Sequence, residues 1–353
     1  MILALLPGAF ADPLIINGED ASIADYPMTG ALIMQATFTY GKHTFPLSSI
    51  VCSSTLIAPD VVLLAAHCVD DLVLTGGYGT IEDKVLAWTR QSDLTDWDGL
   101  HYLPAWPLDA VTVRATVAHE DYSILDFGTG LTENHDVALL FLDEALTGIP
   151  VAYLPSKQES LQIEEGLTVE IVGWGQQTAT PAWKPPPAGT YALKQMGESY
   201  IARLAPYEMQ IGLEKDDVRK CHGDSGGPTF LDIETTTDDA MRVIGVTSHS
   251  YDASDCDHTG GVDTRVDYYL DWIDDQMRGA CDDGTRVWCK EPGILVPPTT
   301  APPEDTGVED VTSDGGDKEN AGCGCGTTRA SPLPAILAGL LALRRKVGNP
   351  RRP

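Results

Sequence analysis

The sequence is poor in positive charge. Its 353 residues include 23 Lys and Arg against 52 Asp and Glu, which gives a formal net charge of −29. Such a chain would be repelled by a phosphate backbone, so nucleic acid is excluded as a partner. Six of the basic residues lie within 329–353, where no acidic residue occurs. The C-terminal end is therefore a basic segment attached to a strongly acidic body.

Long hydrophobic runs and metal-binding cysteine motifs are also lacking. The apolar run from Leu333 to Leu343 would rise only about 17 Å as a helix, against a bilayer core of about 30 Å. None of the eight cysteines forms a CxxC pair, and no histidine lies at zinc-ligand spacing from them. We therefore predict no metal site and no cofactor.

Six of the cysteines fall into pairs with separations that suit disulfides. The separations are 16, 35 and 8 positions, for Cys52 and Cys68, Cys221 and Cys256, and Cys281 and Cys289. Disulfides form in oxidising compartments, so these spacings favour an exported protein. A free buried thiol remains the alternative for any one of them.

Residues 1–11 have the features of a weak or truncated signal peptide. The apolar run Ile2–Leu6 is followed by Ala9-Phe10-Ala11, which fits a signal-peptidase site, although no Lys or Arg precedes the run. The alternative is a few apolar residues buried before the first strand. We expect export, with residues 12–14 as a short propeptide.

The C-terminal part has the composition of a linker followed by a sorting signal. Residues 292–320 are rich in Pro, Thr, Gly, Asp and Glu, which disfavours a packed core. A small-residue motif with Cys323 and Cys325 follows, then the apolar run and the cluster Arg344–Lys346. This order resembles the myxobacterial-type (MYXO-CTERM-like) sorting signals, which are processed near the cysteine motif. We expect a linker over 280–320, clipped by Cys281 and Cys289, and a sorting or anchor signal over 321–353; a plain short tail anchor is the alternative.

The body of the chain is predicted to be rich in β-strands. Between residues 15 and 278, short β-branched runs alternate with Gly, Pro and Asp, which is typical of a barrel or sandwich. One helical pattern occurs, in Val266–Arg278, where apolar residues recur at steps of three and four positions. We expect this helix to end just before Gly279, acting as its C-cap.

Three short segments carry residue types suited to nucleophilic catalysis. They are Ala65-Ala66-His67-Cys68, a run that begins His135-Asp136-Val137, and the Gly-rich Cys221–Pro228. A serine hydroxyl needs a base beside it, a histidine serves near neutral pH, and a buried carboxylate fixes its tautomer. His67, Asp136 and Ser225 supply this set, in the order His, Asp, Ser. Taken singly, a histidine at a strand end is more often structural, and capping of a turn is the alternative for Asp136.

The segment Gly223–Gly227 also satisfies G-x-S-x-G, the signature of the α/β-hydrolase nucleophile. That fold needs a helix directly after the serine, but Gly226, Gly227 and Pro228 disfavour one. It also needs the acid and the histidine downstream of the serine, and an alternation of strands and helices that the sequence lacks. We therefore set this alternative aside.

With these motifs, the sequence from Ile15 to Arg278 resembles the trypsin/chymotrypsin-like serine proteases. The resemblance rests on Val51–Ile57, Ala65–Cys68, His135–Leu140, Gly173-Trp174-Gly175 and Gly223–Pro228, in that order. It implies an all-β fold of two antiparallel Greek-key β-barrels (chymotrypsin-like) with a C-terminal α-helix, over residues 15–279. His67 would come from the first barrel, Asp136 from the connection and Ser225 from the second.

The resemblance also implies supporting roles. The backbone N–H groups of Gly223 and Ser225 would form an oxyanion hole, and Ser248 would support Asp136. Cys52–Cys68 would brace the histidine loop and Cys221–Cys256 the specificity pocket. Cys281–Cys289 has no counterpart in the family, and we expect a local clip after the helix.

Activation by proteolysis is a further implication. Ile15-Ile16-Asn17-Gly18 resembles the mature N-terminus of the family, whose freed amino group pairs with the residue that corresponds to Asp224. The alternative is that Ile15 belongs to an edge strand and Asp224 to a turn. Leu14 precedes Ile15, so a non-tryptic protease or an aminopeptidase would have to trim the chain.

The resemblance places Arg219 at the base of the specificity pocket, with Ser250 and Gly261 on its walls. Arg219 disfavours tryptic specificity and would favour a substrate Asp or Glu through a charge-assisted contact. The alternative is that Arg219 faces solvent or pairs with Asp216 or Asp217. The long stretches 74–114 and 178–187 are expected to form surface loops that shape substrate access.

We therefore expect an exported serine endopeptidase of non-tryptic specificity, extracellular or anchored at the cell surface. Its partners would be a peptide or protein substrate, an activating or trimming protease and the sorting machinery. A non-catalytic homologue that uses the fold for binding, and an esterase with the same chemistry, are the alternatives.

Overall fold

The computed structural model describes residues 15–97, 99–100, 102–178, 187, 189–233, 241–252, 256 and 259–297. The signal peptide and propeptide expected over residues 1–14 lie outside the described residues. So do the linker from residue 298 onward and the sorting signal over 321–353, with Cys323 and Cys325.

The first half of the body is a closed antiparallel barrel of six strands. These are β2 (Thr29–Tyr40), β3 (His43–Ala58), β4 (Val61–Leu64), β5 (Thr80–Thr89), β7 (Val111–Ala118) and β8 (Ala138–Leu142). They are hydrogen-bonded in the order β2-β5-β7-β8-β4-β3, and β3 pairs back with β2 to close the barrel. The β2–β3 hairpin turns at Gly41, whose φ of 61° suits a tight hairpin turn.

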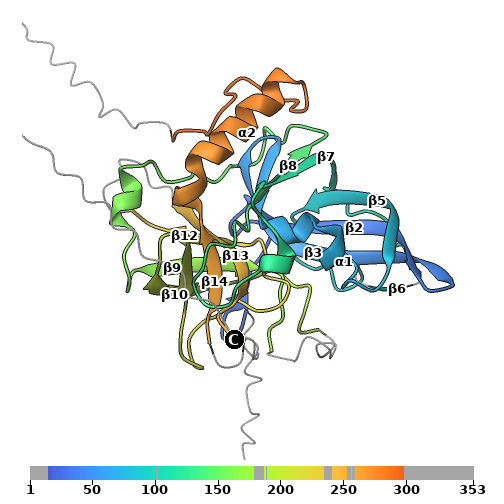
Figure 1. Ribbon diagram of the computed structural model, residues 1–353, viewed down its shortest axis with the longest axis horizontal. Coiled ribbons are helices and arrows are strands. Elements are labelled where there is room, and N and C mark those ends of the chain that lie inside the picture. Colours follow the sequence, from blue (N-terminus) through green and yellow to red (C-terminus); the bar gives the residue numbers. More distant parts are fainter. Residues whose placement is uncertain are drawn as a thin grey trace, which may run out of the picture. The chain divides into compact units, whose positions relative to one another are not determined.

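The second half is another closed six-stranded barrel. Its strands are β9 (Thr168–Gly173), β10 (Gln195–Leu204), β11 (Glu208–Ile211), β12 (Pro228–Leu231), β13 (Arg242–Ser250) and β14 (Gly261–Arg265). Their order is β10-β11-β14-β13-β12-β9, closed by the β9–β10 pairing. Two short strands, β1 (Glu19–Asp20) and β6 (Gly99–Leu100), extend the edges of the two sheets. The predicted fold class is confirmed (Figure 1).

The C-terminal helix α2 (Leu270–Asp282) follows a single 3₁₀ turn, Val266–Tyr269. Its buried face, including Ile273 and Met277, joins a hydrophobic cluster with residues of both barrels. The predicted end before Gly279 was wrong, because the helix runs through that residue. Gly284, with φ of 79°, follows the C-cap Asp283 and takes the left-handed conformation that ends the helix.

The loop after α2 is docked on the first barrel. The disulfide Cys281–Cys289 closes it, as predicted. Inside the loop, the Arg286 guanidinium donates to Asp60 Oδ1 from Nη2 at 2.8 Å, and both side chains are fully buried. The other oxygen, Asp60 Oδ2, accepts the backbone N–H groups of Val287 and Trp288. These contacts hold residues 286–288 against the turn between β3 and β4.

The stretch 74–114 differs in part from the surface loops expected there. It contributes β5 and the start of β7 to the barrel, and Trp88 on β5 is fully buried. A Cβ on Gly30 of β2 would lie 2.3 Å from the Trp88 ring, so this large side chain needs the glycine opposite it. Trp97 is also buried and packs on Trp106, with ring centroids 4.9 Å apart. Much of the stretch is therefore core rather than loop.

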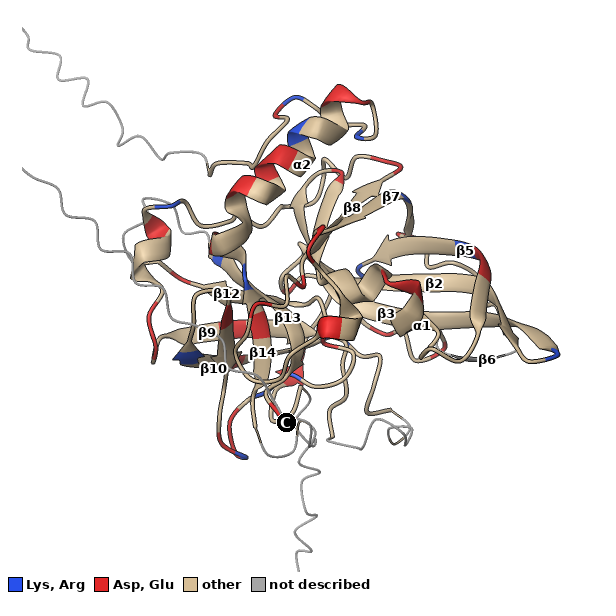
Figure 2. Cartoon of the chain, in the orientation of Figure 1, with Lys and Arg blue, Asp and Glu red and all other residues tan. Residues whose placement is uncertain are grey.

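Acidic residues outnumber basic ones in the chain, and Figure 2 marks their positions along α2 and on both barrels. Some of the ion pairs that these residues form are exposed, such as Arg114–Asp143, whose side chains are 42% and 40% exposed. None of the helices in the described ranges combines the length and the apolar character that crossing a membrane requires.

The buried pair Asp60–Arg286 generates a stability prediction. Arg286→Leu should lower the free energy of unfolding by about 3–5 kcal/mol, because it leaves a buried carboxylate without its counter-charge. Arg114→Leu, which breaks an exposed pair, is the matched control and should cost no more than about 1 kcal/mol. Urea denaturation of both variants measures the difference, and equal losses would contradict the docking role of Arg286.

Candidate active site

His67 and Asp136 are brought together by the pairing of two short strands. β4 and β8 are antiparallel neighbours, with Leu64 opposite Ala138. His67 follows β4 in the 3₁₀ turn Ala66–Val69, and Asp136 lies just before β8, so both residues leave the same end of the pair. His67 Nδ1 lies 2.7 Å from Asp136 Oδ2, and the His67 backbone N–H donates to Oδ1 at 2.9 Å.

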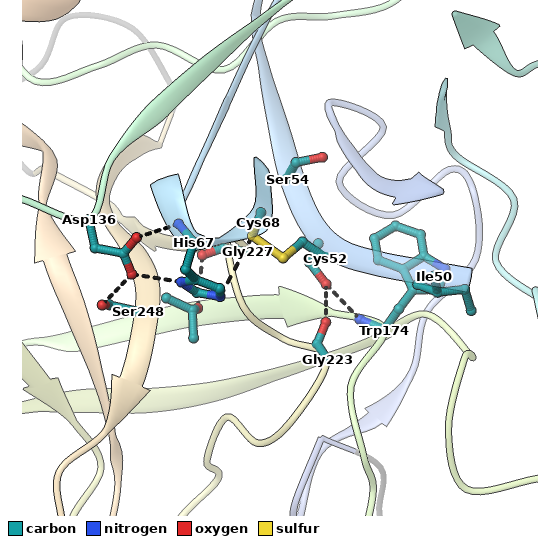
Figure 3. The surroundings of a disulfide bond; sticks show 12 residues. Ile50, Cys52, Ser54, His67, Cys68, Asp136, Trp174, Gly223, Gly227 and Ser248 are labelled. Atoms are coloured by element: carbon teal, nitrogen blue, oxygen red, sulfur yellow. Dashed lines mark hydrogen bonds and ion pairs between the residues drawn. A yellow bond between two sulfur atoms is a disulfide. The ribbon is translucent and has the colours of Figure 1, made fainter. Parts of the chain in front are cut away.

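The second barrel completes the surroundings of Asp136. Ser248 on β13 donates its hydroxyl to Asp136 Oδ2 at 2.6 Å, and Thr264 on β14 donates to the Asp136 backbone carbonyl at 3.0 Å. The Asp136 side chain is completely buried. Figure 3 shows His67, Asp136 and Ser248 in this chain of contacts, beside the disulfide Cys52–Cys68. Donors from both barrels thus satisfy one buried carboxylate.

The electrostatics of the pair favour a charged Asp136 and a basic His67. Burial disfavours the imidazolium of His67, but the negative charge of Asp136 and the hydrogen bond to it outweigh this and raise the pKa of His67. Burial likewise acts to raise the pKa of Asp136, but the His67 charge and the bonds from His67 and Ser248 lower it below its usual value. At neutral pH the carboxylate is therefore ionised and orients the ring.

Ser225 lies on a loop whose backbone conformation requires glycine at two positions. Gly223 has φ of 98° and Gly226 has φ of 75°. A Cβ on Gly226 would lie 2.5 Å from the Ser53 carbonyl oxygen, and one on Gly223 would lie 2.9 Å from Gly175 Cα. The Ser53 backbone N–H of the first barrel donates to the Ser225 carbonyl at 2.8 Å. The loop is thereby held against β3.

The backbone amides of this loop are available to a ligand. Within the described residues, neither the Gly223 N–H nor the Ser225 N–H donates a hydrogen bond to the protein. In the described structure, Ser225 Oγ also forms no hydrogen bond with His67. The His67 Nε2 atom instead lies 3.7 Å from Cys68 Sγ. The site therefore combines an oriented histidine base with two backbone N–H groups that have no acceptor among the described residues. The hydrogen bond between Ser225 and His67 that general-base catalysis requires is not formed in this structure.

A cavity of about 240 Å³ opens beside Ser225. Its walls include the predicted pocket residues Ser250 and Gly261, together with Ser248 and His249. The disulfide Cys221–Cys256 forms as predicted and places Cys221 in the lining. Four residues predicted from the sequence as site residues thus line one cavity: Ser225, Ser248, Ser250 and Gly261.

Arg219, expected at the base of this cavity, does not line it. The side chain is 1% exposed, and its guanidinium donates to the backbone carbonyls of Lys215, Asp217 and Cys256. The lysine that follows, Lys220, lines the cavity instead. Lys220 Nζ contacts Asp263, which our sequence analysis did not identify. The signal that could have found it is a carboxylate between Val262 and Thr264 in a strand.

Ile15 and Asp224, the expected activation pair, are both buried but not bonded to each other in the described structure. The Ile15 side chain lies in the core of the second barrel. Asp224 accepts hydrogen bonds from the backbone N–H groups of Gly175 and Cys221, at 2.8 and 2.9 Å. Burial raises the pKa of Asp224 to about 6. In the intact chain the Ile15 nitrogen is a peptide N–H, so it offers this carboxylate no charge.

Three groups of described residues bring potential metal ligands together. Two of them consist of disulfide cysteines beside a histidine, whose sulfurs are already bonded. The third is His119, Asp121 and His135. The His119 and His135 rings stack, with centroids 4.8 Å apart and planes inclined by 10°. Stacked rings direct their nitrogen lone pairs side by side rather than toward a common point, so this group is not arranged as a metal centre.

Comparisons with known proteins agree with this geometry. The family described as Trypsin matches residues 15–273. The chain is 27% identical over 277 residues to phenoloxidase-activating factor 1 of Holotrichia diomphalia, covering 75% of this chain and 70% of that protein. It is 27% identical to a tryptase of Mus musculus, covering 73% of this chain and 87% of that one. A trypsin of Phaedon cochleariae is 25% identical, with 74% and 88% covered.

The contact between His67 and Asp136 predicts a measurable titration. The pKa of His67, followed by NMR, should lie above the ordinary 6.5 and should fall in Asp136→Asn, because burial remains while the counter-charge is lost. Asp70→Asn, which removes a weaker contribution, is the control and should lower the pKa less. An unchanged pKa in Asp136→Asn would contradict the pairing.

Proposed function

The chain belongs to the trypsin family, and on this premise we propose that it is a serine endopeptidase acting through His67, Asp136 and Ser225. The observation that carries the proposal is the chain of contacts from Ser248 through Asp136 to His67 Nδ1, which leaves the other ring nitrogen, Nε2, on the side of the ring away from the carboxylate. A histidine held in this way serves as a general base near neutral pH.

In the proposed mechanism, Ser225 Oγ attacks the substrate carbonyl while His67 Nε2 accepts its proton. Asp136 holds the ring and stabilises the imidazolium. The oxyanion would be bound by the free N–H groups of Gly223 and Ser225, and such a donor typically contributes about 3–4 kcal/mol. His67 then protonates the leaving amine, and water, activated by the same base, hydrolyses the acyl-enzyme.

A fluorophosphonate probe tests the nucleophile directly. The mature protein should be labelled covalently, and Ser225→Ala should abolish labelling and lower kcat at least about 10⁴-fold on a peptide substrate. Ser250→Ala, on the cavity wall, is the control and should keep the labelling. Mature protein that is not labelled would favour the non-catalytic homologue, and turnover of esters without peptides would favour the esterase.

We also infer that the chain requires cleavage before Ile15. A new α-amino group there would supply the cationic partner that the buried Asp224 lacks in the described structure. The pairing would lower the pKa of Asp224 from about 6, because an adjacent positive charge favours the carboxylate. Leu14 makes a non-tryptic activating or trimming protease the partner for this step.

The proposed localisation is extracellular or anchored at the cell surface. It is supported by three disulfides, which are characteristic of oxidising compartments. The sorting machinery would act on residues 321–353, near Cys323 and Cys325.

Mass spectrometry of the native mature protein tests both ends. We expect the active form to begin at Ile15 and the chain to end at or before the cysteine motif, with or without an attached lipid. A stable start at Asp12 with full activity would contradict the activation step, and an intact C-terminus at Pro353 would contradict processing of the tail.

A further inference from the structure

A buried ionic cluster lies beneath the cavity at Ser225. Lys220 Nζ is 2.8 and 3.0 Å from the two oxygens of Asp263, and 2.7 Å from Thr229 Oγ1. The Thr229 hydroxyl in turn donates to Asp263 Oδ2. The side chains of Lys220 and Asp263 are 1% and 0% exposed. The lysine and the aspartate therefore neutralise each other away from water.

Lys220 connects this cluster with the cavity. Lys220 is one of the residues that line the cavity, whereas Asp263 is not. On β14, Gly261 and Asp263 are two positions apart and so face the same side of the sheet. A Cβ on Gly261 would lie 3.4 Å from Lys220 Cβ. The Lys220 side chain thus begins at the cavity wall beside Gly261 and ends at Asp263, covering the carboxylate.

The charges determine what this end of the cavity accepts. Among the described residues that line it, Lys220 is the only Lys, Arg, Asp or Glu. The buried Lys220 ammonium and Asp263 carboxylate neutralise each other, so this end of the cavity offers a charged substrate side chain no free counter-charge. Burial lowers the pKa of His249, so this wall residue is neutral at neutral pH. A charged side chain would lose its water here without gaining a partner, whereas an uncharged side chain avoids this cost.

We propose that Lys220 masks Asp263, so that the cavity accepts uncharged substrate side chains, and that Asp263 is a latent site for a cationic group. The proposal rests on the proposed protease function for its substrates, but the masking itself is a property of the cavity. Lys220 and Asp263 are thus specificity-determining residues, in place of Arg219.

Removal of the mask should convert the specificity. Lys220→Ser shortens the side chain, opens the cavity toward Asp263 and leaves the carboxylate without its cation. Because a charge-assisted hydrogen bond would become available, the ratio of kcat/KM for peptides cleaved after Lys to those cleaved after Ala should rise roughly 10- to 100-fold. The double variant Lys220→Ser/Asp263→Asn has the same space without the anion and should lose this gain.

Wild-type protein tests the proposal without any substitution. A matched set of peptides that differ only in the residue before the scissile bond should be cleaved best after uncharged residues. Preferred cleavage after Lys or Arg, or after Asp or Glu, would overturn the proposal even where the Lys220→Ser variant does not fold.

A binding measurement separates this proposal from the catalytic one. Benzamidine, an aromatic amidinium, should bind Lys220→Ser/Ser225→Ala at least about tenfold more tightly than it binds Ser225→Ala, as measured by calorimetry on mature protein. Circular dichroism checks that both variants fold. Folded Lys220→Ser/Ser225→Ala with no gain in affinity would overturn the masking, whereas failure of fluorophosphonate labelling in wild-type protein would overturn only the catalytic proposal.

Discussion

The structure depends on how the buried carboxylate of Asp136 is satisfied. A completely buried charge is stable only where donors surround it, and here the donors come from both barrels. His67, at the end of β4, contributes its ring and its backbone N–H, and Ser248 contributes its hydroxyl from β13. Thr264 holds the backbone of Asp136 from β14. One residue therefore fixes the position of the base and the fit between the barrels at the same point.

The serine loop depends on a similar exchange between the barrels. The Ser53 hydroxyl, on β3, donates to the Gly223 carbonyl and accepts the backbone N–H of Trp174. This hydroxyl lies between the loop that carries Ser225 and the end of β9. With the bond from Ser53 N–H to the Ser225 carbonyl, it orients the carbonyl groups of the residues on both sides of Asp224. Glycine at 223 and 226 is the sequence requirement for that path.

The sequence predicted those features that depend on short, local motifs. The segments around His67, Asp136 and Ser225 indicated the family and therefore the two barrels, and the cysteine spacings indicated the three disulfides that form. The helix was also predicted, but its end was wrong, because Gly279 tolerates a helical conformation and Gly284 supplies the left-handed one. A glycine alone does not show which of the two it will adopt.

Features that depend on distant partners could not be predicted in the same way. Lys220 and Asp263 are 43 positions apart, and Arg286 and Asp60 are 226 apart, so neither contact leaves a local pattern. The Arg219 guanidinium donates to three backbone carbonyls, those of Lys215, Asp217 and Cys256, which no short motif predicts. Trp88 on β5 was expected in a loop, because no sequence motif shows that Gly30 lies opposite it and makes room for its ring.

The docked loop after α2 has a mechanical consequence. The Ile294 backbone N–H donates to Asp274 on the outer part of the helix, and Arg286 is bound to Asp60 on the first barrel. Tension on the chain beyond residue 297 would therefore be shared between the Ile294–Asp274 contact on α2 and the loop closed by Cys281 and Cys289. Part of the load would pass through Arg286 into the β3–β4 turn rather than through the helix alone. The attachment would therefore divide force on this end of the domain between the helix and the first barrel.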